Sequence, residues 1–429
     1  MCHRARAGER KNRMRKLFVL TMVVFMAGLL MSTGLHAERE RFVEKEFEAT
    51  PGGTLEIDIE TGGDIAITGW SGKTVAVKAR MTGRDREDIE IDFDETRDGI
   101  KIHTYYEGHK HGRNGDVNLE IKVPEKFDIE IDTKGGDVTV TGVEGGFSGK
   151  TFGGDLEFTK LKGNIRFTTM GGDIRVSDSE VDGRVKTMGG DVEIRDVVGD
   201  IKGHTMGGNV TYRNVTGWGR AEEKEVSITT MGGDIDVDYP DRKVKLRTFG
   251  GDIDVGKAEE VNVKTMGGDI NIGEAPVGAE VSTMGGDITI RSAGEYARAK
   301  TLGGDIEICA IDGWAKAKTL GGDITVRMVG DPGRGKRDVE LESLGGDIEL
   351  IVPAGLSMAF DIELSYTKKN EGKCRIESDF DMKINETKEW ERKWGQKRRY
   401  IYGTGSVNGG EHRIKIKTMN GNITIRKGS

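Results

Sequence analysis

The sequence predicts an all-β fold, a single-stranded parallel β-solenoid (β-helix) of about 12 coils of 18 residues between β-rich caps. The first observation is that Gly-Gly-Asp followed by an aliphatic residue recurs along the chain at a period of 18. The second is that apolar and polar residues alternate after each copy, as in a half-buried strand. The third is that 65 of the 429 residues are Gly and only 6 are Pro. A periodic glycine surplus predicts one repeat body rather than two or three ordinary domains.

Residues 1–37 have the pattern of an export signal. Seven basic residues precede an uncharged stretch at residues 17–31, and Ala37 ends the segment at a suitable cleavage position. The alternative is a retained anchor, because the 19 residues from Leu17 to Leu35 carry no charge and could span a bilayer. Either form predicts an exported protein, which is periplasmic, on the cell surface or secreted. Cleavage near Ala37 is the favoured form.

The charge and the cysteines exclude two classes of protein. Loss of residues 1–37 would remove seven basic residues and one acidic residue, so that the formal net charge would change from −8 to −14. An acidic exported protein lacks the basic footprint of a nucleic-acid-binding protein. Cys309 and Cys374 are the only cysteines beyond the leader, which is too few for a disulfide framework.

Residues 38–132 are expected to form an N-terminal β-rich cap. They are strand-like but out of register with the repeat, and ETGGDIAITGWSGKTVAVKARM (residues 60–81) reads as a first coil-like hairpin. A solenoid needs such caps because its open strand edges recruit other chains. His103, His109 and His111 could be metal ligands, but their setting favours an ordinary polar loop.

Residues 133–349 hold the 18-residue repeat, for example TMGGDIRVSDSEVDGRVK at residues 169–186. Ile174 and Val176 alternate with a polar residue in one strand, and Val185 belongs to a second strand. Gly171 and Gly172 are expected at a corner that needs positive φ. One unit cannot bury its apolar face alone, so equivalent strands should pair from coil to coil about 4.8 Å apart. Right-handed coiling is the expectation for parallel crossovers. Propeller blades need about 40 residues each and are excluded.

Stacking at this period turns two sequence positions into apolar and hydroxyl columns. A column of Thr, from Thr133 to Thr319, is expected to line the interior and to hydrogen-bond from coil to coil. The next position is mostly Met, and alternation would turn it outward as an exposed stripe, which usually marks an interaction surface. We favour the alternatives, which are that the corner returns these side chains to the core or that neighbouring Lys stems cover them. The candidate partner surface on this column comprises Met170, Met188, Met266 and Met284.

A column of Asp follows the glycines and concentrates negative charge. Each adjacent pair would repel by roughly 0.9 kcal/mol at the permittivity of water. The favoured offset is that each carboxylate accepts N–H groups of its own turn, beside a basic column five residues earlier that includes Lys150 and Lys318. A ladder of divalent cations is the less favoured alternative. Its ligands would be Asp173, Asp191, Asp269, Asp287, Asp305 and Asp323.

Residues 350–429 are expected to form a C-terminal β-rich cap that ends in a final repeat-like strand. The segment KEWERKWGQKRRY at residues 388–400 has six basic and two acidic residues interleaved with aromatic rings. Such a patch could contact anionic head groups or an acidic polysaccharide, although a charged edge strand is the favoured alternative. Trp70, Trp218 and Trp314 are expected to cover turns. The candidate contact residues in the patch are Trp390, Arg392, Lys393, Trp394, Arg398 and Arg399.

Three stretches resemble a known bacterial family of β-strand repeats, the "putative adhesin" family, whose core domain has no established function. They are FEATPGGTLEIDIETGGDIAITGW (residues 47–70), VPEKFDIEIDTKGGDVTV (residues 123–140) and IKTMNGNITI (residues 416–425). The resemblance covers residues 42–429 and rests on the repeated GGDI pattern. It implies a secreted or surface β-solenoid and supplies no catalytic residues.

These observations favour an exported, non-catalytic, adhesin-like module that has a structural or binding role at the cell envelope. Catalytic residues, cofactors and a resident metal are not expected. Its partner could be an envelope polysaccharide, an anionic membrane surface or another protein. One alternative is a β-helical polysaccharide-active enzyme, which would need two carboxylates with different environments in one cleft. The other is a membrane-anchored sensor of envelope stress.

Overall fold

The computed structural model describes residues 40–97, 99–107, 114–217, 225–393 and 395–428. The expected export signal at residues 1–37 lies outside this part of the chain, as do His109, His111, Trp218 and Trp394. Within the described residues, no helix combines the length and the apolar character needed to cross a bilayer. The described chain is all-β, because its helical segments are two single turns of 3-10 helix, η1 and η3.

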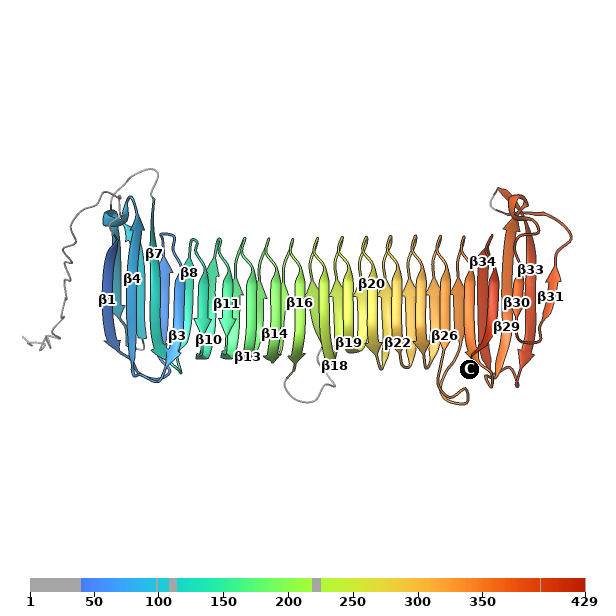
Figure 1. Cartoon of the computed structure of the whole chain (residues 1–429), viewed down its shortest axis with the longest axis horizontal. Coiled ribbons are helices and arrows are strands. Elements are labelled where there is room, and N and C mark those ends of the chain that lie inside the picture. Colours follow the sequence, from blue (N-terminus) through green and yellow to red (C-terminus); the bar gives the residue numbers. More distant parts are fainter. Residues whose placement is uncertain (1–39, 98, 108–113, 218–224, 394, 429) are drawn as a thin grey trace, which may run out of the picture. The chain divides into compact units, whose positions relative to one another are not determined.

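The repeat forms strands β8 to β28, which follow one another in chain order (Figure 1). Their apolar residues alternate with polar ones, so that each strand buries one face. The strands are β8 (Asp128–Thr133), β9 (Val138–Thr141), β10 (Glu144–Thr151), β11 (Leu156–Thr159), β12 (Lys162–Thr168), β13 (Ile174–Lys186), β14 (Val192–Val198), β15 (Ile201–His204), β16 (Val210–Thr216), β17 (Glu225–Thr229), β18 (Ile235–Arg247), β19 (Ile253–Lys264), β20 (Ile270–Ala275), β21 (Gly278–Ser282), β22 (Ile288–Ala293), β23 (Tyr296–Lys300), β24 (Ile306–Ile311), β25 (Trp314–Lys318), β26 (Ile324–Met328), β27 (Val339–Glu342) and β28 (Ile348–Pro353).

Two parallel ladders run through these strands. In one ladder, the strand that follows each Gly-Gly-Asp pairs with its equivalent in the next repeat, as Ile270 does with Ile288. In the other, the strand that precedes Gly-Gly-Asp does the same, as Val281 does with Ala299. Each repeat therefore contributes one segment to each ladder, and in β13, β18 and β19 the two segments belong to one long strand. This is the parallel, solenoid-like stacking that the period of 18 predicts.

The N-terminal strands combine parallel and antiparallel pairing. β2 and β3 pair in parallel with β8 and β9, and on their other side with β6 and β7. β4 then pairs antiparallel with both β1 and β7, and β5 pairs antiparallel with β6. The elements are β1 (Arg41–Glu48), β2 (Thr54–Ile59), β3 (Ile65–Trp70), β4 (Thr74–Gly83), η1 (Arg86–Asp88), β5 (Ile89–Glu95), β6 (Gly99–Tyr106) and β7 (Gly115–Pro124).

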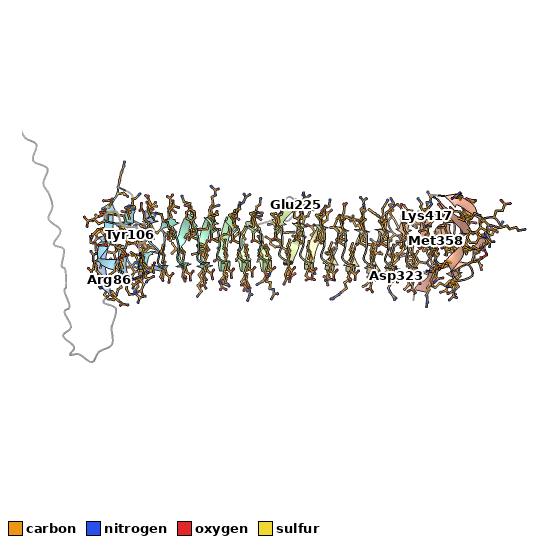
Figure 2. The ribbon with its side chains drawn as sticks, turned by 90° about the horizontal axis from the view of Figure 1, so that it is seen from above. Arg86, Tyr106, Glu225, Asp323, Met358 and Lys417 are labelled. Atoms are coloured by element: carbon orange, nitrogen blue, oxygen red, sulfur yellow. The ribbon has the colours of Figure 1, made fainter. Side chains whose placement is uncertain are left out.

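At the other end the chain leaves the stack after β28 and later returns to it. β34 and β35 pair in parallel with β27 and β28, and β29 and β33 form an antiparallel pair beyond them. In Figure 2, Arg86 and Tyr106 mark the N-terminal end of the stack, whereas Met358 and Lys417 mark the C-terminal end. The elements are β29 (Met358–Thr367), η3 (Lys368–Asn370), β30 (Ile376–Ser378), β31 (Lys383–Glu386), β32 (Glu391–Lys393), β33 (Gln396–Val407), β34 (His412–Met419) and β35 (Ile423–Gly428).

One continuous hydrophobic core lies between the two ladders. It extends from Leu55 near the start of the described chain to Ile425 near its end. Thr side chains that precede the glycines are buried along it, Thr187 and Thr205 completely. Buried hydroxyl groups must be hydrogen-bonded, and these Thr hydroxyls find their partners in the corner that follows each Thr and in the preceding coil.

Candidate binding surface

Each coil turns at two corners, and the first is the Thr-Met-Gly-Gly-Asp turn, here called the GGD corner. The other, between the strand after Asp and the next strand, is called the far corner. In the GGD corner at residues 283–287, the Oγ1 atom of Thr283 donates to the carbonyl oxygen of Gly268 in the previous coil at 2.9 Å. Oγ1 of Thr283 also accepts a hydrogen bond from the N–H of Gly286 at 3.4 Å. Each Thr therefore ties its own turn to the preceding one, so the expected coil-to-coil bond goes to a glycine carbonyl.

The second glycine of the corner is required by the closeness of the stacked coils. A Cβ atom on Gly172 would lie 1.8 Å from the carbonyl oxygen of Gly154 in the previous coil. A Cβ atom on Gly171 would meet nothing nearer than 4.0 Å. Neither Gly171 nor Gly172 has a positive φ, so the expectation that both glycines serve a left-handed conformation is wrong here. The physical reason is that the backbones of successive coils approach too closely for any side chain.

The Asp column joins successive coils through the backbone. The N–H of Asp287 donates to Oδ1 of Asp269 in the previous coil at 2.8 Å, and Asp305 donates to Asp287 in the same way at 2.8 Å. The Asn at position 209 takes the same role, since it accepts from the N–H of Asp234 at 2.8 Å. The expectation that each carboxylate caps its own turn is therefore wrong. The next coil's amide lies closer to each carboxylate because the coils stack in register.

The basic column five residues before Asp does not offset this charge at every coil. Lys150 pairs with Asp132 at 2.9 Å, and Lys318 pairs with Glu342 at 2.6 Å. In each case the hydrogen bond to that neighbouring carboxylate raises the pKa of the lysine. These two cations are thus paired with acids on the strand surface.

The metal ladder stays a prediction with less support. Within the described ranges, no group of three or more His, Cys, Asp or Glu residues gathers in a geometry that could hold a metal ion. Oδ1 of each candidate ligand already accepts a backbone N–H from the next coil. These ligands are Asp173, Asp191, Asp269, Asp287, Asp305 and Asp323.

The Met column is exposed, contrary to the favoured expectation that the corner returns it to the core or that Lys stems cover it. Eleven large apolar side chains on successive GGD corners have exposed fractions between 37% and 59%. Backbone bonds join their residues from coil to coil, as from Leu320 N to Leu302 O at 3.2 Å. Thr before it is buried, whereas the stripe residue itself lies in the bend that begins the corner and is exposed. This apolar stripe comprises Phe152, Met170, Met188, Met206, Met231, Phe249, Met266, Met284, Leu302, Leu320 and Leu344.

The stripe has charged columns of opposite sign on its two sides. Lys264 and Lys300 are exposed at the ends of strands that lead into the corner, two residues before the stripe. The Asp side chains follow three residues after it, where the chain enters the other ladder, and those of Asp269 and Asp287 are exposed. The GGD corner therefore presents an apolar line between a partly basic column and an acidic column.

The basic–aromatic segment of the C-terminal region is partly built into the fold. Trp390 is half-buried and packs edge-on against Tyr366, with ring centroids 5.8 Å apart. Arg399 lies over the Trp390 ring at 5.7 Å and pairs with Glu371 at 3.3 Å. Arg392 is exposed and Arg398 is half-buried, while the side chain of Lys393 and the whole of Trp394 lie outside the described residues. As a partner surface this segment stays a prediction.

The other candidates are engaged by their surroundings. His103 lies 3.2 Å from Asp58 and stacks on Tyr105. Trp70 is half-buried at a turn and donates from Nε1 to Thr74 O at 2.9 Å. Trp314 stacks on Tyr296 with ring centroids 5.5 Å apart. Cys309 and Cys374 are both free.

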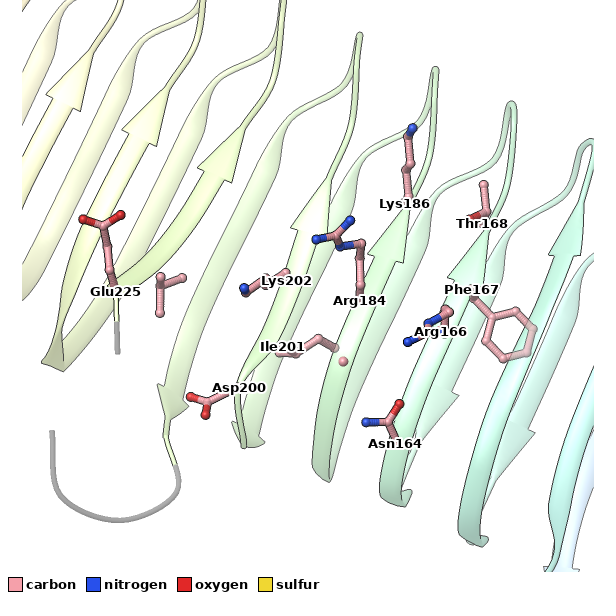
Figure 3. Close-up of a pocket in the computed structure, with 12 residues that line it drawn as sticks. Asn164, Arg166, Phe167, Thr168, Arg184, Lys186, Asp200, Ile201, Lys202 and Glu225 are labelled. Carbon is pink, nitrogen blue, oxygen red and sulfur yellow. The ribbon is translucent and has the colours of Figure 1, made fainter. Parts of the chain in front are cut away.

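Two groups of residues escaped the sequence analysis. Arg242 and Arg337 are almost completely buried at far corners, and a single Arg that does not recur in the other coils gives no pattern by which to find it. Arg166, Arg184 and Lys202 form a basic row across adjacent strands (Figure 3). An alignment of the repeats at a period of 18 could have found this row, because its three residues all lie seven residues before the Asp position of the repeat.

Comparisons with known proteins find one protein family and several solved structures that are similar to this chain. The model of one protein family, described as Toastrack DUF4097, matches residues 49–291 and 238–426. No curated protein matches the chain. Among solved structures, a putative cell adhesion protein from Clostridium sporogenes is similar at 10% identity, over 91% of this chain and 100% of that chain, with a TM-score of 0.18.

Two further solved structures are similar at low identity. A putative lipid binding protein from Parabacteroides distasonis shares 12% identity over 72% of this chain and 96% of that chain, with a TM-score of 0.24. A putative adhesin from Bacteroides fragilis shares 16% identity over 67% of this chain and 97% of that chain, with a TM-score of 0.18. TM-scores this low support no argument about this chain.

Proposed function

This chain belongs to the Toastrack DUF4097 family, and from that premise we propose that it is an exported, non-catalytic, adhesin-like module of the cell envelope. Its role is structural or binding, and it associates with a second copy of itself through the apolar stripe. The observation that carries this proposal is the stripe, because an unbroken exposed apolar patch is typical of an interaction surface.

The finer architecture and the location belong to the same proposal. Residues 133–349 form a right-handed solenoid of about 12 coils of 18 residues, between caps at residues 38–132 and 350–429. Residues 1–37 direct export to the periplasm, the cell surface or the medium and are removed near Ala37. A purified N-terminus at Glu38, detected by mass spectrometry, would support cleavage. An intact N-terminus would favour the membrane-anchored sensor instead.

A second copy suits the stripe because of the charges beside it. A two-fold rotation about an axis parallel to the stack places one stripe against the other. That rotation also exchanges left and right, so the basic column of one copy faces the acidic column of its partner. Such an isologous contact is self-complementary in both shape and charge. Around Met266 and Met284, for example, Lys264 would face an Asp of the second copy.

The structural role of the Asp carboxylates supports the non-catalytic part of the proposal. The Asp residues form a uniform ladder whose Oδ1 atoms accept backbone N–H groups, so no pair differs from its neighbours in the way that acid–base catalysis needs. Turnover of an acidic polysaccharide that is lost on a single Asp change would contradict this and would favour the polysaccharide-active enzyme.

Sedimentation velocity of the purified chain tests the self-association. We expect a concentration-dependent dimer that dissociates at high salt, because its rim is charged. The double variant Met266→Gln and Met284→Gln should weaken the dimer at least about tenfold. A matched control, Val198→Gln with Ile384→Gln, changes two apolar residues that are exposed away from the stripe and should leave the dimer unchanged. A wild-type chain that stays monomeric, or a variant that dimerises equally, would overturn the proposal.

A further inference from the structure

We infer that a hollow on the sheet formed by β12, β13, β15 and β17 binds a linear anionic polysaccharide through a row of cationic side chains. Arg166, Arg184 and Lys202 occupy equivalent positions of consecutive coils and are direct cross-strand neighbours. All three side chains are exposed. Figure 3 shows them in a row across adjacent strands, with Lys186 nearer the end of its strand. Neighbouring strands lie about 4.8 Å apart, which sets the spacing of the charges.

These cations have no acidic partner among the residues that the structure describes. Arg166, Arg184, Lys186 and Lys202 form no ion pair there. The two acids that line the hollow are already engaged, since Asp200 lies 3.5 Å from Arg242 and Glu225 lies 3.4 Å from Lys245. Like charges on directly opposed strand positions destabilise a sheet. A row of unpaired cations therefore has a cost to the fold that an anionic ligand would remove.

Further along the chain, the residues at the equivalent position of the repeat form ion pairs. In the later coils the neighbouring cations Arg298 and Lys316 lie between two acids. Arg298 lies 3.7 Å from Glu280, and Lys316 pairs with Glu340 at 2.5 Å. The chain can thus neutralise this column, and in the coils of Arg166, Arg184 and Lys202 it does not. The excess positive charge is local to the hollow, on a chain whose net charge is −8.

The shape of the site favours a polymer that follows the stack. The hollow has a volume of about 890 Å³, and besides the cations it is lined by Asn164, Thr168 and Gly183. Gly183 has no side chain, and a Cβ there would lie 2.0 Å from the carbonyl oxygen of Ile165, so the backbone surface stays open. Asn164 and Thr168 offer hydrogen bonds that suit sugar hydroxyl groups.

The regular spacing of the charges also favours a carbohydrate over a membrane. The repeat of one sugar in an extended β-1,4-linked chain is close to the strand spacing. Successive sugars face opposite sides, so the carboxylates on one side of a uronic acid polymer recur at about every second strand and can meet Arg166 and Lys202 together. A planar bilayer cannot enter a hollow on the face of a sheet.

His204 lies beside Lys186 in the adjacent strand, where burial and the charges of Lys186 and Arg184 lower its pKa. That shift is consistent with a site of positive potential.

Calorimetric titration of the purified chain with a β-1,4-linked mannuronate hexamer tests the inference. β-1,4-linked mannohexaose is the matched neutral probe and should not bind. The variant Arg184→Gln with Lys202→Gln should weaken mannuronate binding at least about tenfold, because charge-assisted contacts are lost. The control Arg298→Gln with Lys316→Gln removes two paired cations from the same column and should change binding less than about twofold. Circular dichroism melting confirms that both variants fold.

Three results would overturn the inference. They are equal affinity for the neutral hexamer, equal weakening in the control variant, or no binding of mannuronate by the wild-type chain. Vesicles that contain phosphatidylglycerol provide the remaining arm, and vesicle binding that needs Arg184 and Lys202 would assign the site to a membrane instead. The stripe variant Met266→Gln with Met284→Gln should bind mannuronate normally, so failure of this inference and failure of self-association are distinguishable.

Discussion

The two corners of the coil differ in how much variation they tolerate. The spacing between successive Gly-Gly pairs departs from 18 three times beyond Gly135: two insertions and one deletion. The insertions fall between β16 and β17 and between β26 and β27, and the deletion falls where β18 shifts register against β19 between Val237 and Lys243. All three irregularities lie at the far corner. The GGD corner keeps its length in every coil, and this is why its exposed stripe is continuous.

The physical reason is the number of bonds that each corner makes to its neighbours. At the GGD corner, Thr hydroxyls, Asp carboxylates and backbone amides all bond to adjacent coils, so a change in length would break several of them. At the far corner a longer segment can leave the stack at little entropic cost. It then needs its own partners. Arg337, almost fully buried, donates to the carbonyl oxygens of Arg334 and Val329 at 3.0 and 2.8 Å.

The largest expected effect separates the two glycines of one GGD corner. Gly172→Ala should lower the free energy of unfolding by about 3 kcal/mol or more, because its Cβ would lie 1.8 Å from the carbonyl oxygen of Gly154. Gly171→Ala should change it by less than about 0.5 kcal/mol, since a Cβ there meets nothing nearer than 4.0 Å. Urea denaturation of both variants measures the difference. Equal losses would mean that backbone conformation, rather than the contact between coils, requires glycine.

The second effect concerns the buried hydroxyl column. Thr301→Val keeps the shape but loses the bond to Gly286 O at 2.9 Å and leaves the Gly304 N–H without its acceptor. We expect a loss of about 2 kcal/mol, as for other unsatisfied buried groups. Thr325→Val is the control, because Thr325 is half-exposed on β26, and it should be nearly neutral. Equal denaturation midpoints for the two variants would show that the hydroxyl bonds add nothing.

The third effect tests what the Asp column does. Asp287→Ala removes the acceptor for the N–H of Asp305 and should cost about 1 kcal/mol. Asp287→Asn keeps that acceptor and relieves repulsion from the neighbouring Asp residues, so it should be neutral or slightly stabilising at low salt. Excess chelator should leave the melting temperature of the wild-type chain unchanged. A fall in melting temperature with chelator would instead support the metal ladder.

Much of the stack could be predicted from the sequence, because its period is written in every coil. The register of Gly-Gly-Asp predicted the parallel pairing of equivalent strands, as between Ile270 and Ile288. The outward direction of Met188 was less certain, since a turn can rotate a side chain and alternation alone does not decide it. The partners of Asp287 could not be predicted, because bonds to the same turn and to the next coil satisfy the same sequence pattern. Only the stacking of the coils in the structure distinguishes them.

A smaller effect should come from the far corner. Lys160 has φ of 56° there, and the equivalent positions of the next coils, Asp178, Asp196 and Asn214, share this left-handed conformation. Asp and Asn tolerate it, whereas Lys has no local hydrogen bond to offset the strain. Lys160→Gly should therefore stabilise the chain by about 0.5 kcal/mol, after allowing for the greater freedom of Gly in the unfolded state. Denaturant midpoints measure this, and a destabilised Lys160→Gly would show that the corner is not strained.

The smallest expected effect is a pH dependence at His204, which stands where several other coils have Lys before the GGD corner. Burial first, and then the charges of Lys186 and Arg184 on β13, lower its pKa, while a hydrogen bond to the backbone of Thr229 on β17 acts in the opposite direction. The unfolded chain therefore binds a proton on this residue at a higher pH than the folded chain. The stability that neutral His204 contributes is fully present above about pH 6.5 and is lost as the pH falls toward the lowered value.

The measurement compares the melting temperatures of the wild-type chain and His204→Gln at pH 7.5 and 5.5. The wild-type chain should lose about 1 °C more than the variant over this interval, because His204 is half-exposed and solvent weakens the effect. The mannuronate hexamer should reduce the loss, since a bound anion next to Lys186 and Arg184 would make protonation of His204 easier. An identical pH response in both chains would show that His204 senses neither cation.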